Sequence, residues 1–399
     1  MIKLPGKSYE MKGKGTEMKS KVAVIRCDTY DSEQVFQAIK EGVNLLGGLE
    51  SIVPKDDRVL FKPNLLNKAA PDKAVTTHPV VFDSVIRLFI EQGYQNMFYG
   101  DSPGNPTNPE KIAEICGIKQ IGDKYGLKFG EFNKGRTVNF PEGRFTKQFE
   151  ISEGALEADT IINVCKMKTH QLERITGGVK NLLGCVYGLN KGMCHAKFPD
   201  ADSFGKMLVD LSRCLKPKLH IMDGIVAMEG NGPFSGTQVD MKVILISTDP
   251  VALDTVFCKL INLDPMLVPT IKYGEAFGLG HCRDEEIDIL GAELKPLVRE
   301  NFNVSREAAK EGKWQKLYII RQLLLKKPVI LSEKCIKCGI CVDACPVEGK
   351  ALYFEEEKHL KPPLYRYDKC IRCYCCQEMC PEEAITVKTP ILGKLLIYK

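Results

Sequence analysis

The C-terminal part of the chain contains CIKCGICVDACP at residues 335–346, and it repeats the same cysteine pattern as CIRCYCCQEMCP at residues 370–381. In each segment three cysteines are separated by two residues, and a fourth follows after three more residues and precedes a proline. This spacing is typical of bacterial proteins with two 4Fe–4S clusters, in which the fourth cysteine of each segment ligates the other cluster. The three closely spaced thiolates can wrap one face of a cubane, whereas the fourth follows a turn and must point elsewhere.

The spacing therefore predicts two clusters that share ligands across the repeat. We assign the first 4Fe–4S cluster to Cys335, Cys338, Cys341 and Cys380. We assign the second to Cys370, Cys373, Cys376 and Cys345. The alternative is structural zinc, because paired C-x2-C motifs also suit tetrahedral zinc, but zinc does not require the C-x3-C-P step twice. Cys375 fits neither set, and we expect it to be a bystander, with a spare ligand or a redox-sensitive thiol as the alternative.

Cysteine usage favours a reducing compartment. The chain has 17 cysteines, and the nine between Cys335 and Cys380 are an odd number in a dense cluster, which is a poor disulfide framework. The start, Met1–Ser20, is polar and lacks the apolar core of a secretory signal. No stretch approaches the ~18 consecutive apolar residues of a membrane span. We expect a cytoplasmic protein without a transmembrane segment.

Upstream of the cysteines, strand-like and helix-like patterns alternate. Short apolar runs at 22–25, 58–61, 97–100, 160–164, 219–222 and 242–246 indicate strands, and 32–46, 79–92 and 251–261 have helical spacing. Several of these runs are apolar throughout, which is typical of strands buried on both faces. The alternation predicts an α/β domain with a mostly parallel sheet flanked by helices.

Composition places this domain within a chain of 399 residues with ordinary globular proportions, 44% hydrophobic and 27% charged. The net charge of +5 is mild, and no aromatic and basic module indicates nucleic acid as a partner. We expect four parts: a disordered N-terminal extension at 1–20, the α/β domain at 21–300, a linker helix at 301–328, and a two-cluster region with a basic and apolar tail at 329–399.

Polar and glycine-rich sequence follows several of the predicted strands. Ligands of open α/β sheets bind beyond the carboxyl ends of the strands, so we expect a site there for a small anion, a carboxylate or a phosphate. The candidate residues are Lys62, Asn64, Asp101, Lys166, Lys168, His170, Gly177, Gly178, Lys180, Asn181, Asp223 and Glu229. The two glycines would let backbone N–H groups approach the anion at a helix start. The alternative is that the lysines are solvated loop charges; neither a P-loop nor a G-x-G-x-x-G motif is present.

Other reactive residue types have simpler interpretations. Asp249 and Pro250 are the ordinary N-cap and first residue of a helix. Cys194 and His195 resemble a nucleophile–base pair, but adjacent residues rarely present both groups to one point. Cys165, Cys185 and Cys194 either fill the core or face the clusters in a redox role, and we favour the core for Cys165 and Cys185.

The motifs together resemble a known family. Lys62-Pro-Asn-Leu, Gly100-Asp-Ser-Pro-Gly, Thr176-Gly-Gly-Val-Lys-Asn, Met228-Glu-Gly-Asn-Gly-Pro and Ser247-Thr-Asp-Pro-Val-Ala resemble the DUF362 family over about 21–290. Residues 329–388 resemble bacterial two-cluster ferredoxin domains, except for Cys375 and a long insert between the repeats. The combination is similar to DUF362 iron–sulfur proteins of anaerobic bacteria and archaea. The resemblance implies an α/β fold plus a small α+β two-cluster ferredoxin-like domain, and it implies no reaction.

Three functions remain open from the sequence. The first is an oxidoreductase in which two clusters exchange electrons with a small anionic substrate held by the α/β domain. The second is a non-catalytic electron carrier whose α/β domain docks a redox partner protein. The third is a non-redox enzyme with structural clusters.

The cluster assignment predicts that anaerobically prepared protein contains about eight irons and about eight acid-labile sulfides per chain, because each cubane holds four of each. Colorimetric iron and sulfide determination on protein of known concentration measures both. A preparation that instead binds zinc stoichiometrically would overturn the assignment.

Overall fold

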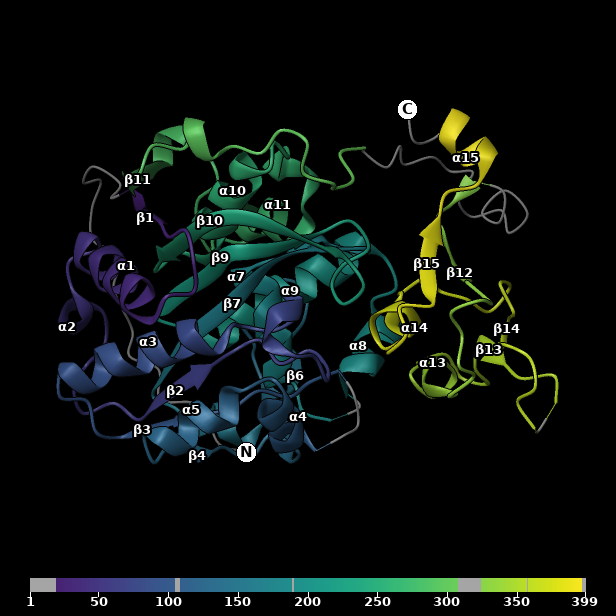
Figure 1. Cartoon of the computed structure of the whole chain (residues 1–399), viewed down its shortest axis with the longest axis horizontal. Coiled ribbons are helices and arrows are strands. Elements are labelled where there is room, and N and C mark those ends of the chain that lie inside the picture. Colours follow the sequence, from purple (N-terminus) through teal and green to yellow (C-terminus); the bar gives the residue numbers. More distant parts are fainter. Residues whose placement is uncertain (1–18, 105–107, 189, 308–323, 357, 397–399) are drawn as a thin grey trace.

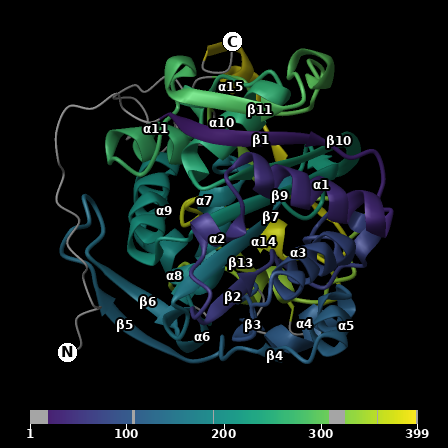
Figure 2. The ribbon, with the colours of Figure 1, turned by 90° about the vertical axis from the view of Figure 1, so that its left-hand side faces the viewer.

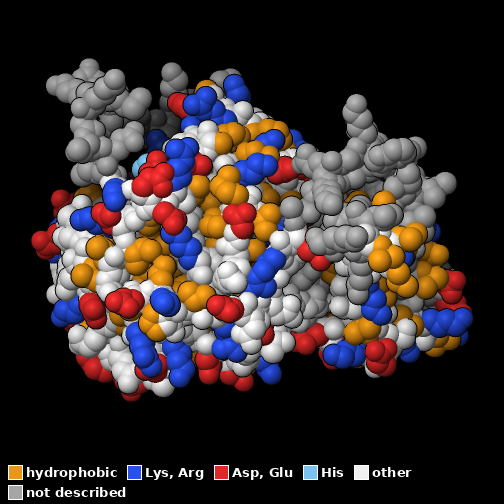
Figure 3. Space-filling model, turned by 90° about the horizontal axis from the view of Figure 1, so that it is seen from above, with side chains coloured by type: hydrophobic (Ala, Val, Ile, Leu, Met, Phe, Trp, Pro, Cys, Tyr) orange, Lys and Arg blue, Asp and Glu red, His pale blue; other side chains and the backbone are white. Residues whose placement is uncertain are grey.

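The computed structural model describes residues 19–104, 108–188, 190–307, 324–356 and 358–396 (Figure 1). We call residues 19–307 the α/β region and residues 324–396 the C-terminal region, and the two lie side by side (Figure 1). Most of the expected N-terminal extension, and residues 308–323 of the linker helix expected at 301–328, lie outside the described residues. The described residues 301–307 of that range are not helical, and 327–328 belong to a strand. On the face seen in Figure 3, acidic and basic side chains are interspersed over the α/β region.

A nine-stranded sheet organises the α/β region, in the order β11-β1-β10-β9-β7-β2-β3-β4, with β8 paired to β7. Its strands are β1 (Ser20–Arg26), β2 (Val59–Lys62), β3 (Met97–Tyr99), β4 (Lys128–Phe129), β7 (Thr160–His170), β8 (Arg174–Thr176), β9 (Leu219–Glu229), β10 (Thr237–Ser247) and β11 (Ile287–Gly291). From β9 to β4 all neighbours are parallel, whereas β10 runs against both of its neighbours. The mostly parallel sheet expected from the sequence is confirmed.

Helices cover both faces of this sheet (Figure 2). One face packs on α1 (Ser32–Leu45), α3 (Pro79–Glu91), α4 (Pro109–Ile115) and α5 (Ile118–Lys124), and the other on α9 (Ala201–Leu215), α10 (Pro250–Leu260) and α11 (Pro269–Ala276). Alternate residues of β1 enter the two cores, Ala23 and Ile25 on one side and Val22 and Val24 on the other. This is why the strand runs are apolar throughout.

The capping prediction for α10 is also confirmed. The carboxylate of Asp249 accepts hydrogen bonds from the backbone N–H groups of Val251 and Ala252, and Pro250 occupies the first turn. Smaller elements complete the region: α2 (Leu49–Ile52), the hairpin β5 (Gly135–Asn139) and β6 (Gln148–Ser152), α6 (Glu153–Leu156), α7 (Gly178–Asn181) and α8 (Asn190–Lys197).

Two strands are longer than the sequence predicts, and this corrects the expected position of several site residues. We expected 165–170 and 223–229 to be loops beyond the strand ends. Instead β7 continues to His170 and β9 to Glu229. Beyond Asn163, the last residue of β7 that pairs with β2, the extension of β7 is held by β8 and β9. A strand with neighbours on both sides satisfies its backbone groups, so polar side chains do not require a loop there.

The C-terminal region is built from two similar halves. Each cysteine segment contains one short helix, α13 (Ile340–Asp343) or α14 (Cys375–Glu378). Each is followed by a short strand, β13 (Leu352–Tyr353) or β15 (Ile385–Lys388), which pair with β14 (Leu364–Tyr365) and β12 (Lys327–Ile330), respectively. The helix α15 (Ile391–Leu396) follows.

Candidate functional site

The thiols predicted for the first cluster come together in the C-terminal region. Cys335, Cys338, Cys341 and Cys380 line one pocket, whose other walls are mainly apolar and include Ile330, Pro363 and Ile385. The thiols of the second set are also neighbours. Burial, together with the thiols of Cys373 and Cys345, raises the pKa of Cys370, and burial, together with the thiols of Cys373 and Cys370, raises the pKa of Cys376. In the first grouping Cys380 of the second segment lies with the three closely spaced cysteines of the first segment.

The backbone of the two cysteine segments has the same unusual geometry. Lys337 and Arg372, which precede the second cysteine of each segment, have φ of 63° and 62°. Gly339 and Tyr374, which precede the two helices, have φ of 81° and 64°. Left-handed backbone at non-glycine residues is uncommon and costs free energy, so its repetition indicates a shape imposed by what the loops enclose.

The chemistry of the donor set fits an iron–sulfur cluster. Burial, together with the neighbouring thiols of Cys380, Cys338 and Cys335, raises the pKa of the Cys341 thiol to about 12. Four such thiols cannot ionise together without a compensating cation, whereas iron binds thiolates and displaces their protons. These residues would hold the first cluster, and the set of Cys345, Cys370, Cys373 and Cys376 would hold the second.

A cavity of about 800 Å³ separates the α/β region from the C-terminal region, and we call it the junction cavity. From the α/β region its lining includes Asn64, Asp101, Lys168, Lys180, Asn181, Lys191 and His195. From the C-terminal region its lining includes Ile340, Ala344, Cys345, Pro346, Val347, Cys375, Glu378 and Met379. Cys345 is one of the predicted ligands of the second cluster, so this cavity brings predicted anion-site residues to the wall of a cluster site.

Two of the predicted site residues that line this cavity, Lys168 and Asn64, are hydrogen-bonded to each other. The predicted residues in the lining are Asn64, Asp101, Lys168, Lys180 and Asn181. The Lys168 ammonium donates to Oδ1 of Asn64 at 2.7 Å and to the carbonyl oxygen of Val75 at 2.6 Å. Burial lowers the pKa of Lys168 well below its ordinary value, and the charges of Lys180 and Lys166 lower it further. A buried amine whose pKa is lowered by neighbouring cations is a feature of functional sites, and a bound anion would oppose that shift.

Lys62 lies behind this wall rather than in it. Its ammonium is buried completely and lies 3.0 Å from Oδ1 of Asp101, whose other oxygen accepts from the backbone N–H of Leu65 at 2.7 Å. A Cβ at Gly184 would lie 1.8 Å from Oδ1 of Asp101, so only glycine fits beside the pair. Lys62 therefore positions a carboxylate at the cavity and is itself not a cavity residue.

Lys166 and Asp223 form a separate buried centre. They are directly opposed on β7 and β9, and the Lys166 ammonium lies 2.7 Å from Oδ2 of Asp223. The hydroxyl of Tyr30 accepts from Lys166 at 2.8 Å and donates to Oδ1 of Asp223 at 2.9 Å. The ring of Tyr30 stacks on that of His78 at 3.6 Å. Neither charged residue lines the junction cavity, so the structure does not bring this pair to the expected anion site.

The expectation for Gly177 and Gly178 is wrong, because the chain supplies its own anion there. The carboxylate of Asp254 accepts from the backbone N–H of Gly178 at 2.6 Å and from that of Val179 at 3.2 Å. A Cβ at Gly177 would lie 2.0 Å from Oδ1 of Asp254. Gly177 is therefore needed for the close approach of Asp254, and the N–H of Gly178 is not available to a ligand.

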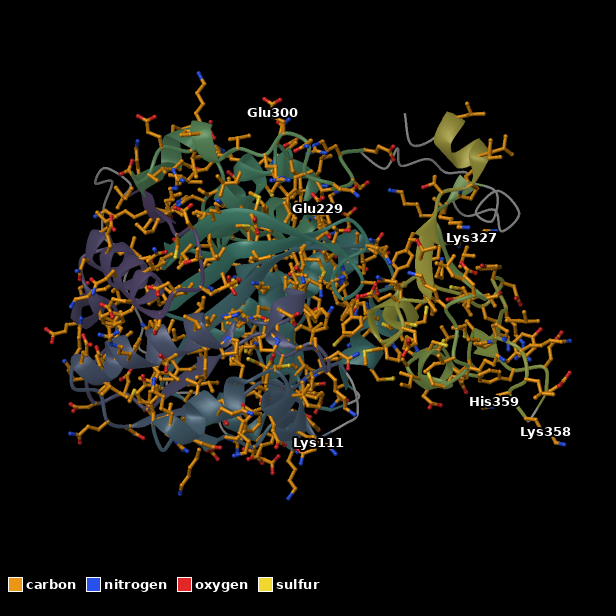
Figure 4. The ribbon with its side chains drawn as sticks, in the orientation of Figure 1. Lys111, Glu229, Glu300, Lys327, Lys358 and His359 are labelled. Atoms are coloured by element: carbon orange, nitrogen blue, oxygen red, sulfur yellow. The ribbon has the colours of Figure 1, made fainter. Side chains whose placement is uncertain are left out.

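His170 and Glu229 serve contacts between elements. Nδ1 of His170 accepts from the N–H groups of Leu172 and Glu173, so the ring proton is on Nε2, which lies 2.8 Å from Oε1 of Glu378 in the C-terminal region. Burial lowers the pKa of His170 to about 4, which keeps the ring neutral. Oε2 of Glu229, which is labelled in Figure 4, accepts a hydrogen bond from the backbone N–H of Asn303.

The motif that includes Glu229 also joins the two regions. The side chain of Asn231 donates to the carbonyl oxygen of Ile385 at 3.2 Å, and the carbonyl oxygen of Asn231 accepts from the side chain of Gln377 at 2.8 Å. Gln377 belongs to α14, between two predicted cluster ligands. The contacts of His170 and Asn231 thus hold the second cysteine segment against the sheet.

Sequence reasoning missed several cavity residues, among them Lys191, His195 and Glu378. Lys191 is buried, donates to the carbonyl oxygen of Ser102, and has its pKa lowered to about 7 by burial, against the opposing effect of Asp101. His195 stacks on Phe204 and is also buried. In the sequence Lys191 is a lysine 11 residues after Lys180 in a polar segment, and this pattern does not distinguish a buried lysine from a solvated one. Cys165 and Cys185 are buried in the core of the α/β region as expected, and Cys375 is buried and lines the cavity.

Comparison with known proteins agrees with this architecture. Residues 59–259 match the family model described as a domain of unknown function, DUF362, and residues 327–381 match a 4Fe–4S dicluster domain. The chain belongs to the DUF362 family. It is 35% identical over 263 residues to a thylakoid-associated protein of Synechocystis sp., covering 66% of this chain and 81% of that protein.

Two solved structures are also similar to the DUF362 chain. One is the lactate racemase apoprotein of Thermoanaerobacterium thermosaccharolyticum, with a TM-score of 0.35 and 12% identity over 59% of this chain and 55% of that chain. The other is a structural genomics protein of Thermotoga maritima, with a TM-score of 0.30 and 12% identity over 51% of this chain and 52% of that chain. The chain thus spans about half the length of each. Among the described residues, none forms a helix long and apolar enough to span a bilayer.

The buried pair of Lys62 and Asp101 predicts a large effect of a single substitution. Lys62→Met should lower the free energy of unfolding by about 3–5 kcal/mol, because it leaves a buried carboxylate without its cation. Urea unfolding followed by circular dichroism measures the change. Lys111→Met, at an exposed residue of α4 (Figure 4), is the control. The double variant with Asp101→Asn should recover much of the loss, and equal stability of Lys62→Met and Lys111→Met would contradict the role of the pair.

The low pKa of Lys191 predicts a specific pH dependence. Between about 7, where the folded protein releases this proton, and about 10.4, where the unfolded chain does, the unfolded state binds more protons. The contribution of Lys191 to stability therefore rises with pH in this window, by up to about 1.4 kcal/mol per pH unit. Any stability advantage of Lys191→Met should consequently shrink from pH 7 to pH 9. Lys197→Met, at an exposed residue of the same helix, should show no such trend, and parallel curves for both variants would refute the assignment.

Proposed function

We propose that the protein is an iron–sulfur oxidoreductase that binds a small anionic substrate in the junction cavity. The observation that carries the proposal is the composition of that cavity, in which Lys168, Lys180 and Lys191 share one space with Cys345. Two 4Fe–4S clusters, when bound, would exchange electrons with the substrate one at a time. The chain's own residues would hold the anion beside the second cluster site and exclude bulk water.

The lysines supply the binding chemistry in this proposal. Burial lowers the pKa of both Lys168 and Lys191, so an anion would be bound together with protons that recharge these amines. Asn64 and Asn181 line the same wall and can donate or accept hydrogen bonds without adding charge. A site of this kind fits a substrate that gains or loses protons along with electrons.

Electrons would enter or leave at the other cluster site. Cys338 is exposed, and the neighbouring Ile336 has 58% of its surface accessible. This side of the C-terminal region is therefore open to a redox partner protein. The same exposure favours the second candidate function, a carrier that only passes electrons between proteins. The free thiols of all described cysteines are consistent with a reducing, cytoplasmic location, which we also propose.

Stopped-flow reoxidation of dithionite-reduced protein separates the two candidate functions. An oxidoreductase should be reoxidised by a small anionic oxidant, and Lys180→Ala should slow this at least 10-fold while leaving reoxidation by an oxidised redox protein unchanged. Lys111→Ala should behave like the parent in both assays. If no small molecule reoxidises the clusters and only another protein does, the carrier function is correct and the oxidoreductase proposal fails.

A further inference from the structure

The junction cavity has two walls of different chemistry. On the α/β wall the charged groups are mainly cationic: Lys168, Lys180 and Lys191 face Asp101, which is already paired with Lys62. On the opposite wall the apolar side chains of Ile340, Val347 and Met379 come from the two cysteine segments and the loop after Pro346. Charged residues of the C-terminal region also line this wall: Glu378, and the exposed Asp343, Glu348 and Lys350. A ligand that fills the space therefore meets mainly cations on the α/β wall, and apolar side chains between charged ones on the opposite wall.

His195 adds a polar group that the described residues leave unsatisfied. The side chain is 4% exposed, and its Nδ1 has no hydrogen-bond partner in the described part of the chain. Burial lowers its pKa to about 3, so the ring is neutral and one of its nitrogens carries a proton to donate. Buried polar atoms are nearly always hydrogen-bonded in folded proteins. An unpaired ring nitrogen in a residue that lines a cavity points to a ligand that would complete it.

The size of the cavity excludes the smallest anions as its full occupant. About 800 Å³ lies in the upper part of the range of small-molecule sites, which is ~300–1,000 Å³. An inorganic ion or a two-carbon acid would leave the wall of Ile340, Val347 and Met379 in contact with water. Removing apolar surface from water is favourable, so these three side chains add affinity only for a ligand that contacts them.

We infer that the ligand of the junction cavity is an amphipathic anion, a carboxylate or phosphate that carries a ring-sized or acyl-sized apolar body. Its anionic group lies on the lysine wall with His195, and its apolar body lies on the wall formed by the C-terminal region. The inference deepens the proposed function, because it names the substrate class of the same cavity. It also makes the ligand a bridge between the sheet and the second cluster site, beside Cys345.

Three probes of matched shape test this on the anaerobic, cluster-loaded protein by isothermal titration calorimetry. 2-Naphthoate should bind with one site per chain and at least 100-fold more tightly than acetate, since only the first buries an apolar body. 2-Naphthalenemethanol, which has the same ring but no charge, should bind at least 10-fold more weakly than 2-naphthoate. Equal affinity for acetate and 2-naphthoate, or for the alcohol and the acid, would overturn the inference.

Substitutions on each wall assign the binding to this cavity. Lys180→Met and His195→Phe, which keeps a ring to stack on Phe204, should each weaken 2-naphthoate at least 5-fold. On the opposite wall, Val347→Asp should weaken the binding of 2-naphthoate, because it places a carboxylate against the ring. The visible absorbance of the clusters shows whether they remain intact in this variant. Lys111→Met is the matched control. Parent-like affinity in all three cavity variants would place the probe elsewhere and refute the inference.

The result separates this inference from the proposed function. If 2-naphthoate binds as expected but no anion reoxidises the reduced clusters, the ligand class stands and the oxidoreductase proposal fails. If a short anion reoxidises the clusters and 2-naphthoate does not bind, the function stands and the ligand class is wrong.

Discussion

The polar side chains of β7 each require a partner, because they are buried within a sheet. Lys166, Lys168 and His170 alternate along one side of the strand and are at most 3% exposed. Taking an ammonium out of water costs several kcal/mol unless hydrogen bonds or an opposite charge replace the water. Lys166 meets Asp223 on β9, Lys168 meets Asn64 after β2, and His170 meets Glu378 in the C-terminal region. One strand thereby connects the neighbouring strands, the cavity and the second cysteine segment.

This requirement explains what the sequence could and could not predict in the α/β region. The apolar runs located the strands, because burial on both faces leaves a local pattern. The extension of β7 was missed because Lys166, Lys168 and His170 were interpreted as loop charges. The period of two in that stretch, in which Cys165 and Met167 alternate with Lys166 and Lys168, was present but is short and directly follows an apolar run. Polar residues in a strand are stabilised only by partners distant in sequence, such as Asp223, and one sequence does not reveal those partners.

The cysteine segments show the opposite situation. Their ligand sets follow from spacing alone, since three of the four thiols in each set are within seven residues of one another. The junction cavity is different, because its lysines come from β7, α7 and α8 while its apolar wall comes from another region. The glycines after β8 illustrate the same limit: Gly177 and Gly178 suit close approach of an anion, and the anion is Asp254, 76 residues from Gly178. Composition indicated the chemistry correctly but not which carboxylate supplies it.

The contact between the regions gives the cavity its chemical asymmetry. Lys168, Lys180 and Lys191 line the junction cavity from the α/β side, and Lys168 and Lys191 are buried. Burial dominates the lowered pKa of Lys168 and Lys191, because nearby carboxylates, Glu378 and Asp101 for Lys168 and Asp101 for Lys191, offset the loss of water only in part. Electron transfer to a bound molecule changes its charge, and amines that gain protons readily can compensate that change inside a low-dielectric space. The cost of burying these lysines is thus the physical property that suits the cavity to chemistry in which charge and protons move together.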